Sequence, residues 1–192
     1  MPPKAKFSRK EIIDNALQIV RESGLKGITA RSLGNKLGSS ARPIFTIFQS
    51  MEEVIDATID EMYNIFDAYI KEGLEEDISF KGSGKSYIRF AKEEPAFFQI
   101  IFMHSNDGLP KKIHLKNTTE LLFSEITESI QKDYGLEKED AFNLYLNMWI
   151  FCHGIATLMV TKMIEFTDDD ISNRLTEVFQ GQLSRIKQKY RK

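Results

Sequence analysis

The sequence predicts an all-α protein, and three observations support that prediction. The 192 residues are 42% hydrophobic and 28% charged, a balance that is ordinary for a globular chain. Apolar residues recur three and four positions apart through most of the chain, which is the spacing of an amphipathic helix. We find no sustained alternation of apolar and polar residues and no Asn-Gly hairpin signal, so strands are not expected.

The N-terminal region begins with two clear helix signals. The first helix is expected to start after Ser8, because Ser8 and Glu11 have the spacing of a capping box ahead of an apolar run. Gly24 should end this helix as a left-handed cap. The second helix is short, with Thr29 as its N-cap and Gly38 at its end.

A third helix should follow at once, with Ser39 or Ser40 as its cap. Pro43 fits its first turn, because first-turn N–H groups have no intrahelical partner to lose. A second capping-box pattern, Ser50 with Glu53, then opens a fourth helix that is expected to reach about Lys71. The apolar side of the third helix would consist of Ile44, Phe45, Ile47 and Phe48.

Helical spacing continues to the end of the chain. Residues 82–84, a Gly-Ser-Gly sequence, are expected to form a loop. The helix expected over residues 137–166 is apolar on more than one side, which indicates that both sides are buried. The helices expected in this half span residues 85–93, 96–104, 117–134, 137–166 and 168–190.

Charge is distributed unevenly along the chain, whose net charge is −2. Residues 1–50 hold nine Lys/Arg and three Asp/Glu, whereas the other residues hold 17 Lys/Arg and 25 Asp/Glu. A basic N-terminal region on an acidic body favours contact of that region with a polyanion, although a basic solvated face has the same composition. The single cysteine, Cys152, excludes an internal disulfide and is typical of a reducing cytoplasm.

The second and third helices would be joined by residues 38–40 alone, which predicts a helix-turn-helix. Leu33 and Leu37 of one helix would pack against Ile44 and Phe48 of the other. In this motif the second helix enters the DNA major groove, and the residues at its N-terminus contact base edges. A plain α-hairpin within a helical bundle is the alternative.

Residues 8–57 resemble the DNA-binding domain of the TetR family of bacterial transcriptional regulators. The text that carries the resemblance is IIDNALQIVRESGLKGITARSLGNKLGSSARPIFTIFQSMEEVIDA. Farther along, YIRFAKEEPAFFQIIF and WIFCHGIATL resemble a subgroup with a W-x-x-x-HG signature. The resemblance implies a DNA-binding domain in residues 1–50 and a helical effector-binding and dimerisation domain in residues 51–192. It also implies a ligand-responsive regulator, most simply a repressor.

The resemblance implies DNA contacts residue by residue. Arg31 matches a position that often reaches DNA, and Phe45 matches a tyrosine that contacts phosphate. Phe45 lacks the hydroxyl and Met51 stands where a lysine is common, so fewer phosphate contacts are expected. The start of the recognition helix, which faces the bases in the family, corresponds to Ser39, Ser40, Ala41, Arg42 and Pro43.

DNA binding should therefore depend on the cations that remain. Arg42 is the best candidate for reading guanine, because a guanidinium can bond to O6 and N7 together, and a phosphate contact is its alternative. The other groups expected to contribute are Arg31, Thr46 and the basic arm formed by Lys4, Lys6, Arg9 and Lys10. A symmetric dimer would place two such DNA-binding domains about 34–36 Å apart on a near-palindromic DNA operator.

The acidic body is expected to provide a dimer interface and an effector pocket. The last two long helices would form the interface, with Leu144, Phe151, Ile155, Leu158, Leu175, Phe179, Leu183 and Ile186. Aromatic residues at helical spacing favour a pocket for a small apolar or aromatic effector, although plain core packing gives the same pattern. The pocket candidates are Phe66, Tyr69, Tyr87, Phe90, Phe98, Ile101, Phe102, Phe123, Trp149, Cys152 and His153.

Other functions find little support in the sequence. Residues 81–86 resemble the end of a P-loop, but the first glycine is replaced by Ser79 and no strand precedes it. The three histidines lack metal-ligand spacing, so no metal and no cofactor are expected. The apolar run 148–160 is short for a membrane span, and we expect a cytoplasmic homodimer. A helical carrier protein that has lost DNA reading is the second hypothesis, and an enzyme is the third.

Overall fold

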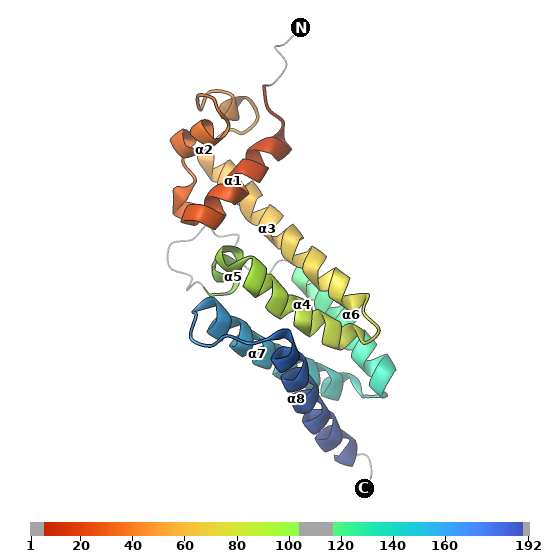
Figure 1. Cartoon of the computed structure of the whole chain (residues 1–192). Coiled ribbons are helices and arrows are strands. Elements are labelled where there is room, and N and C mark those ends of the chain that lie inside the picture. The colour runs from red at the N-terminus through yellow and green to blue at the C-terminus, as the bar shows by residue number, and fades with distance from the viewer. Residues whose placement is uncertain (1–5, 104–116, 190–192) are drawn as a thin grey trace. The chain divides into compact units, whose positions relative to one another are not determined.

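The computed structural model describes residues 6–103 and 117–189, with the side chains of residues 117–123 excepted. Within these ranges all regular secondary structure is helical, which confirms the all-α prediction (Figure 1). The chain divides into two compact units. Unit 1 consists of residues 1–65 and 94–114, and unit 2 of residues 66–93 and 115–192. The division into these units does not test the domain boundary expected at residue 50, which stays a prediction.

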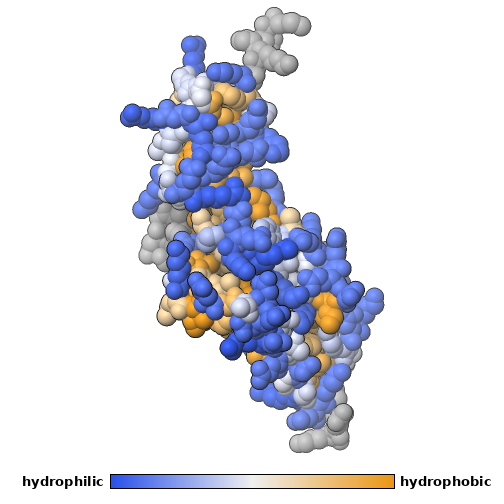
Figure 2. Space-filling view, in the orientation of Figure 1, coloured by the Kyte–Doolittle hydropathy of each residue, from blue (hydrophilic) through white to orange (hydrophobic). Residues whose placement is uncertain are grey.

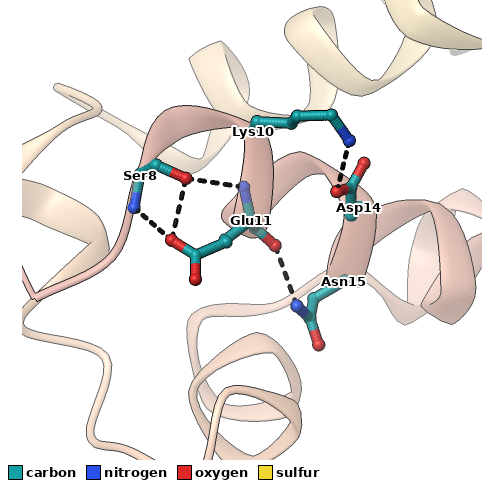
Figure 3. A network of polar contacts seen from close by, with 5 residues as sticks. All are labelled: Ser8, Lys10, Glu11, Asp14 and Asn15. Atoms are coloured by element: carbon teal, nitrogen blue, oxygen red, sulfur yellow. Dashed lines mark hydrogen bonds and ion pairs between the residues drawn. The ribbon is translucent and has the colours of Figure 1, made fainter.

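Unit 1 begins with α1 (Arg9–Ser23), whose N-terminus is closed by the expected capping box. The Ser8 hydroxyl accepts the Glu11 N–H at 3.1 Å, and the Glu11 carboxylate accepts the Ser8 N–H at 2.7 Å (Figure 3). These bonds lower the pKa of the Glu11 carboxyl, the backbone bond most of all. Gly24 has φ +68° and ψ −178°, so it is a positive-φ glycine as expected but not a left-handed helical cap.

The second helix confirms its predicted caps. α2 (Ala30–Lys36) follows Thr29, whose hydroxyl accepts the Ser32 N–H at 3.0 Å, and Gly38 has φ +61°. The third helix was predicted wrongly, because no α-helix forms in residues 37–50. The chain instead makes turns and one short 3₁₀ helix, η2 (Ile44–Thr46). Another 3₁₀ helix, η1 (Leu25–Gly27), links α1 to α2.

α3 (Met51–Leu74) is the long fourth helix, and the boundary between the two units falls within it. Its start departs from the expected capping box. The Ser50 hydroxyl accepts the Glu53 N–H at 3.2 Å, but the Glu53 carboxylate accepts the N–H of Gln49, at 2.7 Å. α5 (Pro95–Phe102) belongs to unit 1 and packs against α1.

The loop expected at residues 82–84 is also wrong, because these residues lie inside α4 (Ser79–Glu93). A Cβ added to Gly82 would lie 2.0 Å from the carbonyl oxygen of Gly73 in α3. The two glycines therefore allow two helix backbones to touch, a close approach that a larger residue would prevent. The gain from this packing outweighs the low helix propensity of glycine.

Unit 2 is completed by α6 (Asn117–Tyr134), α7 (Lys138–Val160) and α8 (Asp168–Lys189). α7 packs against α4, α6 and α8. It ends at Val160, six residues before the predicted end. Lys162 has φ +57°, and the N–H groups of Met163 and Ile164 donate back to the Leu158 carbonyl. No glycine or proline marks this end in the sequence, so the prediction missed it.

α7 is also the helix, within the described residues, that is long and apolar enough to cross a membrane by length and composition. The expectation that its apolar run is too short therefore does not hold for the whole helix. A core helix of a globular protein passes the same test. Because its inner face packs against three helices of unit 2, we assign α7 to the core of that unit.

Candidate functional sites

The segment 39–46 holds most of the predicted DNA-binding residues, and several of its backbone N–H groups bond to carbonyl groups within the same turn. The N–H groups of Ile44, Thr46 and Ile47 donate to carbonyl groups three residues earlier, at 3.0 to 3.2 Å. The Thr46 hydroxyl donates to the Pro43 carbonyl at 2.6 Å. Side chains, rather than these N–H groups, are therefore what this turn can offer to a partner.

The turn is held in place by its apolar side chains. Ile44 and Phe48 are almost completely buried, at 0% and 1% exposure. The Arg9 guanidinium lies over the Phe48 ring, 4.3 Å from its centroid. Arg9 also donates to the Glu53 carboxylate at 3.1 Å. The hydrogen bond from the Gln49 N–H, and after it the bond from Arg9, lowers the pKa of Glu53. These contacts connect the start of α1, the turn and the start of α3.

Many cations of the N-terminal region are already engaged within unit 1. Lys10 pairs with Asp14 at 2.7 Å, and Lys36 pairs with Glu22 at 2.6 Å. Lys6 donates to the Ser39 hydroxyl at 3.1 Å. Arg21 bonds the Glu94 carboxylate through two nitrogens and stacks on the Phe97 ring. The basic composition of residues 1–50 therefore overstates the positive charge that is free to meet a partner.

Arg31, Arg42 and Lys26 are exposed, and none of them makes an ion pair within the described part of the chain. Arg31 and Arg42 are the two guanidinium groups among them. Arg31 lies in the first turn of α2, and Arg42 lies in the turn that precedes η2. Two exposed guanidinium groups on neighbouring parts of one small unit can bind a polyanion such as the DNA backbone.

The other predicted DNA-binding residues differ in what they expose. Phe45 is 47% exposed, which is unusual for a side chain of its size. Ser40 and Thr46 are exposed, whereas Ser39, Ala41 and Pro43 are half-buried. The exposed groups at this site are therefore two guanidinium groups, two hydroxyls and one phenyl ring.

The predicted effector pocket falls in both units. Phe98, Ile101 and Phe102 lie in unit 1, whereas the other candidates lie in unit 2. The side chain of Phe123 lies outside the described residues. The grouping of all these residues around one cavity stays a prediction.

Besides Phe123, seven of the candidates lie in unit 2, and several make direct contacts there. The Phe66 ring meets the Tyr87 and Phe90 rings edge-on, with centroids 5.9 Å and 5.2 Å away. The Tyr87 hydroxyl and the His153 Nδ1 are 2.9 Å apart, within hydrogen-bonding distance. Trp149 stacks on the His153 ring at 5.4 Å, with an interplanar angle of 18°. This side of α4 and α7 thus combines an aromatic cluster with one polar pair.

Burial sets the protonation states in this cluster. It raises the pKa of the Tyr87 hydroxyl, and it raises the pKa of the Cys152 thiol to about 12. It lowers the pKa of His153, because the charged imidazolium is poorly solvated there. The phenol and the thiol are therefore protonated and neutral near pH 7, and neutral His153 is favoured. Cys152 is not an activated thiol.

The predicted dimer residues divide into two groups. Leu144, Ile155, Leu175 and Ile186 are 0% to 8% exposed within their own chain. Phe151, Leu158, Phe179 and Leu183 are half-buried. A side chain already buried in its own subunit has little area left to bury against a second copy. The assignment of these eight residues to an interface stays a prediction.

The structure shows another apolar face on α7 that the sequence reasoning missed. Phe142, Leu146 and Ile150 are 40%, 37% and 55% exposed and lie four residues apart along one side of the helix. A Cβ added to Gly154, the next position in this series, would meet nothing within 4 Å. The spacing was visible in the sequence, but helical periodicity alone does not say which apolar side of a helix faces the core. In Figure 2 hydrophobic patches interrupt a largely hydrophilic surface.

Comparisons with known proteins agree with the fold. A family model described as "Tetracyclin repressor-like, C-terminal domain" matches residues 80–181. The tetracycline repressor protein class D of Escherichia coli is 26% identical over 111 residues, which are 58% of this chain and 46% of the relative. The chain thus spans about half the length of the curated relatives that it matches.

Solved structures resemble the chain over nearly its whole length. A protein of unknown function from Rhodococcus sp. RHA1 superimposes with a TM-score of 0.73 at 17% identity, over 97% of this chain and 99% of that one. A TetR variant from Acinetobacter baumannii AYE, in complex with minocycline, gives 0.59 at 14% identity, over 95% and 98%. These likenesses establish the fold. Because the family model matches more than half of the residues, the chain belongs to the TetR family.

Proposed function

We propose that this chain is a ligand-responsive transcriptional regulator that binds operator DNA through Arg31 and the segment 39–46. The observation that carries the proposal is the exposure of Arg31 and Arg42 without a recorded ion pair, in a unit whose other described cations are largely engaged. Guanidinium groups suit this role, because they bond phosphate and guanine edges with two donors at once. Residues 1–50 would be the DNA-binding domain.

The regulator would most simply be a repressor that blocks its operator. The class D relative is named a repressor, which supports this direction of control. An effector held by residues 51–192 would release the DNA. The aromatic cluster of Phe66, Tyr87 and Phe90 with the polar pair of Tyr87 and His153 supports an apolar or aromatic effector.

The regulator would act as a homodimer, with the exposed face of α7 as part of the interface. Phe142, Leu146 and Ile150 are apolar and carry no charge, so a second copy of the same face suits them. Gly154 leaves open space beside them, which allows two helices to approach closely. A two-fold dimer then presents two DNA-binding domains to a near-palindromic DNA site.

Fluorescence anisotropy tests the DNA-binding part of the proposal. Labelled duplexes from upstream of the gene, or duplexes selected from a random pool, are titrated at two salt concentrations. We expect affinity to fall steeply with salt and to fall roughly ten- to a hundredfold for Arg42→Ala, as for the loss of a good base contact. Lys71→Ala is the matched control, since it removes one exposed cation on α3 in unit 2.

The outcomes separate the two leading hypotheses. Binding that falls with salt and is weakened by Arg42→Ala, with Lys71→Ala unchanged, supports a DNA reader. Equal loss in both variants would indicate nonspecific attraction to charge. No selected consensus and no salt dependence would contradict the proposal and favour a helical carrier protein.

Thermal unfolding tests the effector part. Minocycline is a suitable first probe, because it is the ligand named for the Acinetobacter baumannii neighbour. A ligand that binds the folded state raises the melting temperature, and an effector also lowers DNA affinity. A probe that raises the melting temperature without changing DNA affinity would contradict the coupling between effector and operator.

A further inference from the structure

The side chain of Phe45 is the feature that the proposed function leaves unexplained. It lies in η2 with 47% of its surface exposed, between Ile44 and Phe48, which are buried. These two neighbours already supply the apolar contacts that hold the turn. Exposure of nearly half of a phenyl ring to water is unfavourable, and truncation of Phe45 would remove little from the core.

Phe45 and Arg42 lie three residues apart in one short turn, and both are exposed. The Ile44, Thr46 and Ile47 N–H groups all make bonds that span three residues, so this segment has 3₁₀ geometry. Arg42 precedes η2, so the turn presents an exposed guanidinium, without an ion pair among the described residues, three positions before an exposed phenyl ring.

A partner that contacts both exposed groups of this turn must offer negative charge and an apolar group close together. The DNA major groove has both, because the phosphates line it and each thymine presents a C5-methyl group at its floor. The phenyl ring has no donor or acceptor, so it cannot bond phosphate or a polar base edge. The thymine methyl is the apolar group that distinguishes one base pair from another in this groove.

We propose that Phe45 is a specificity-determining residue that contacts the C5-methyl group of a thymine next to the base read by Arg42. This inference rests on the proposed DNA-binding function and adds a base identity to it. The ring can also pack on a deoxyribose, which would give affinity without sequence preference. Methyl recognition and sugar packing respond differently when a single methyl group is removed.

Replacement of thymine by deoxyuridine removes that methyl group and keeps Watson–Crick pairing. The operator consensus is first selected from random duplexes with the wild-type protein, and each thymine is then replaced singly. At one thymine in each half-site we expect affinity to fall about fourfold, as for the loss of one buried methyl group. Phe45→Ala should lower affinity for the thymine operator and bind the two operators equally.

Two further variants serve as controls. Phe45→Leu keeps an apolar side chain and should keep part of the preference for thymine. Ile78→Ala truncates another exposed apolar residue, 53% exposed and located in unit 2, and should leave the preference unchanged. Urea denaturation checks that Phe45→Ala is folded, which the exposure of the ring leads us to expect.

Each other outcome overturns the inference in a recognisable way. If no thymine replacement affects the wild type, while Phe45→Ala still weakens binding, the ring packs on sugar. If Phe45→Ala binds like the wild type, the ring makes no contact. If selection with the wild type yields no consensus, the proposed function fails, and this inference fails with it.

Discussion

The segment 39–46 and the outer face of α7 are both exposed, but they expose opposite chemistry. The segment carries the cation Arg42 and one exposed phenyl ring, Phe45, and the cation Arg31 lies in α2, the helix that precedes it. The α7 face carries Phe142, Leu146 and Ile150 and no charged side chain at those positions. Charge that stays in water attracts a charged, hydrated partner, whereas an apolar face is stabilised by a partner that excludes water.

This difference predicts which property of the protein is altered when a residue of either surface is replaced. Loss of a cation from the segment should alter DNA affinity and its salt dependence without affecting the fold. A charge placed on the α7 face should alter self-association without affecting the fold of residues 1–50.

The largest effect is expected from Ile150→Asp. In a two-fold interface each copy contributes this residue, so the change acts twice, and each buried isoleucine side chain contributes about 1.5–3 kcal/mol. We expect self-association to weaken by at least about a hundredfold, measured by sedimentation equilibrium. Ile78→Asp places the same charge at an equally exposed isoleucine near the start of α4 and should leave the dimer intact. A dimer unaffected by Ile150→Asp would exclude this face as the interface.

Gly38→Ala should reduce stability at the turn that follows α2. Gly38 has φ +61°, a conformation that costs an L-residue about 1–2 kcal/mol. Urea denaturation should show a lower unfolding free energy for this variant. Gly181→Ala, in α8, is the counterpart within a helix, where a Cβ meets nothing within 4 Å and alanine is favoured. Equal effects of the two substitutions would contradict the assigned backbone of residue 38.

Arg9→Ala and Arg31→Ala should distinguish a cation that stabilises the fold from a cation that contacts DNA. Arg9 stacks on Phe48, a contact of about 0.5–1 kcal/mol at an exposed site, and also pairs with Glu53. We expect Arg9→Ala to lower the urea midpoint. We expect Arg31→Ala to leave the midpoint unchanged and to lower DNA affinity and its salt slope. The reverse pattern would exchange the two roles.

The smallest effect concerns His153 in unit 2. Its pKa is lowered from the ordinary value of 6.5 by burial, so the unfolded state binds the proton more readily. The contribution of neutral His153 to the free energy of unfolding is fully present above about pH 6.5. It is lost as pH falls through the lower pKa of His153 in the folded state. Tyr87 and Cys152 do not titrate in this range, because burial raises their pKa values.

Urea denaturation at pH 8 and pH 5.5 measures this effect. The wild type should lose more unfolding free energy between these pH values than His153→Gln, which has no titrating ring. The other two histidines and the carboxylates are common to both proteins, so their contributions cancel in the difference. An identical loss in both proteins would mean that His153 is not desolvated in the folded state.

Local sequence signals predicted much of the fold because they act over a few residues. The Ser8 and Thr29 caps, the positive-φ Gly38 and the span of α6 depend on bonds within one or two turns. The same local rules failed at residues 82–84, where two glycines were interpreted as a loop. There the contact between the α3 and α4 backbones decided the outcome, and Gly73 lies on a different helix from Gly82.

The candidate sites show the same division. Composition and spacing located the basic N-terminal region and the apolar helix near residue 150, since residue identity alone determines charge and hydropathy. The three-dimensional fold determines that Arg9 and Lys36 are paired, whereas Arg31 and Arg42 make no ion pair among the described residues. It also decided that Leu144 faces the core and Ile150 faces out. Pairing and burial depend on residues that folding brings together, and a linear pattern does not contain those distances.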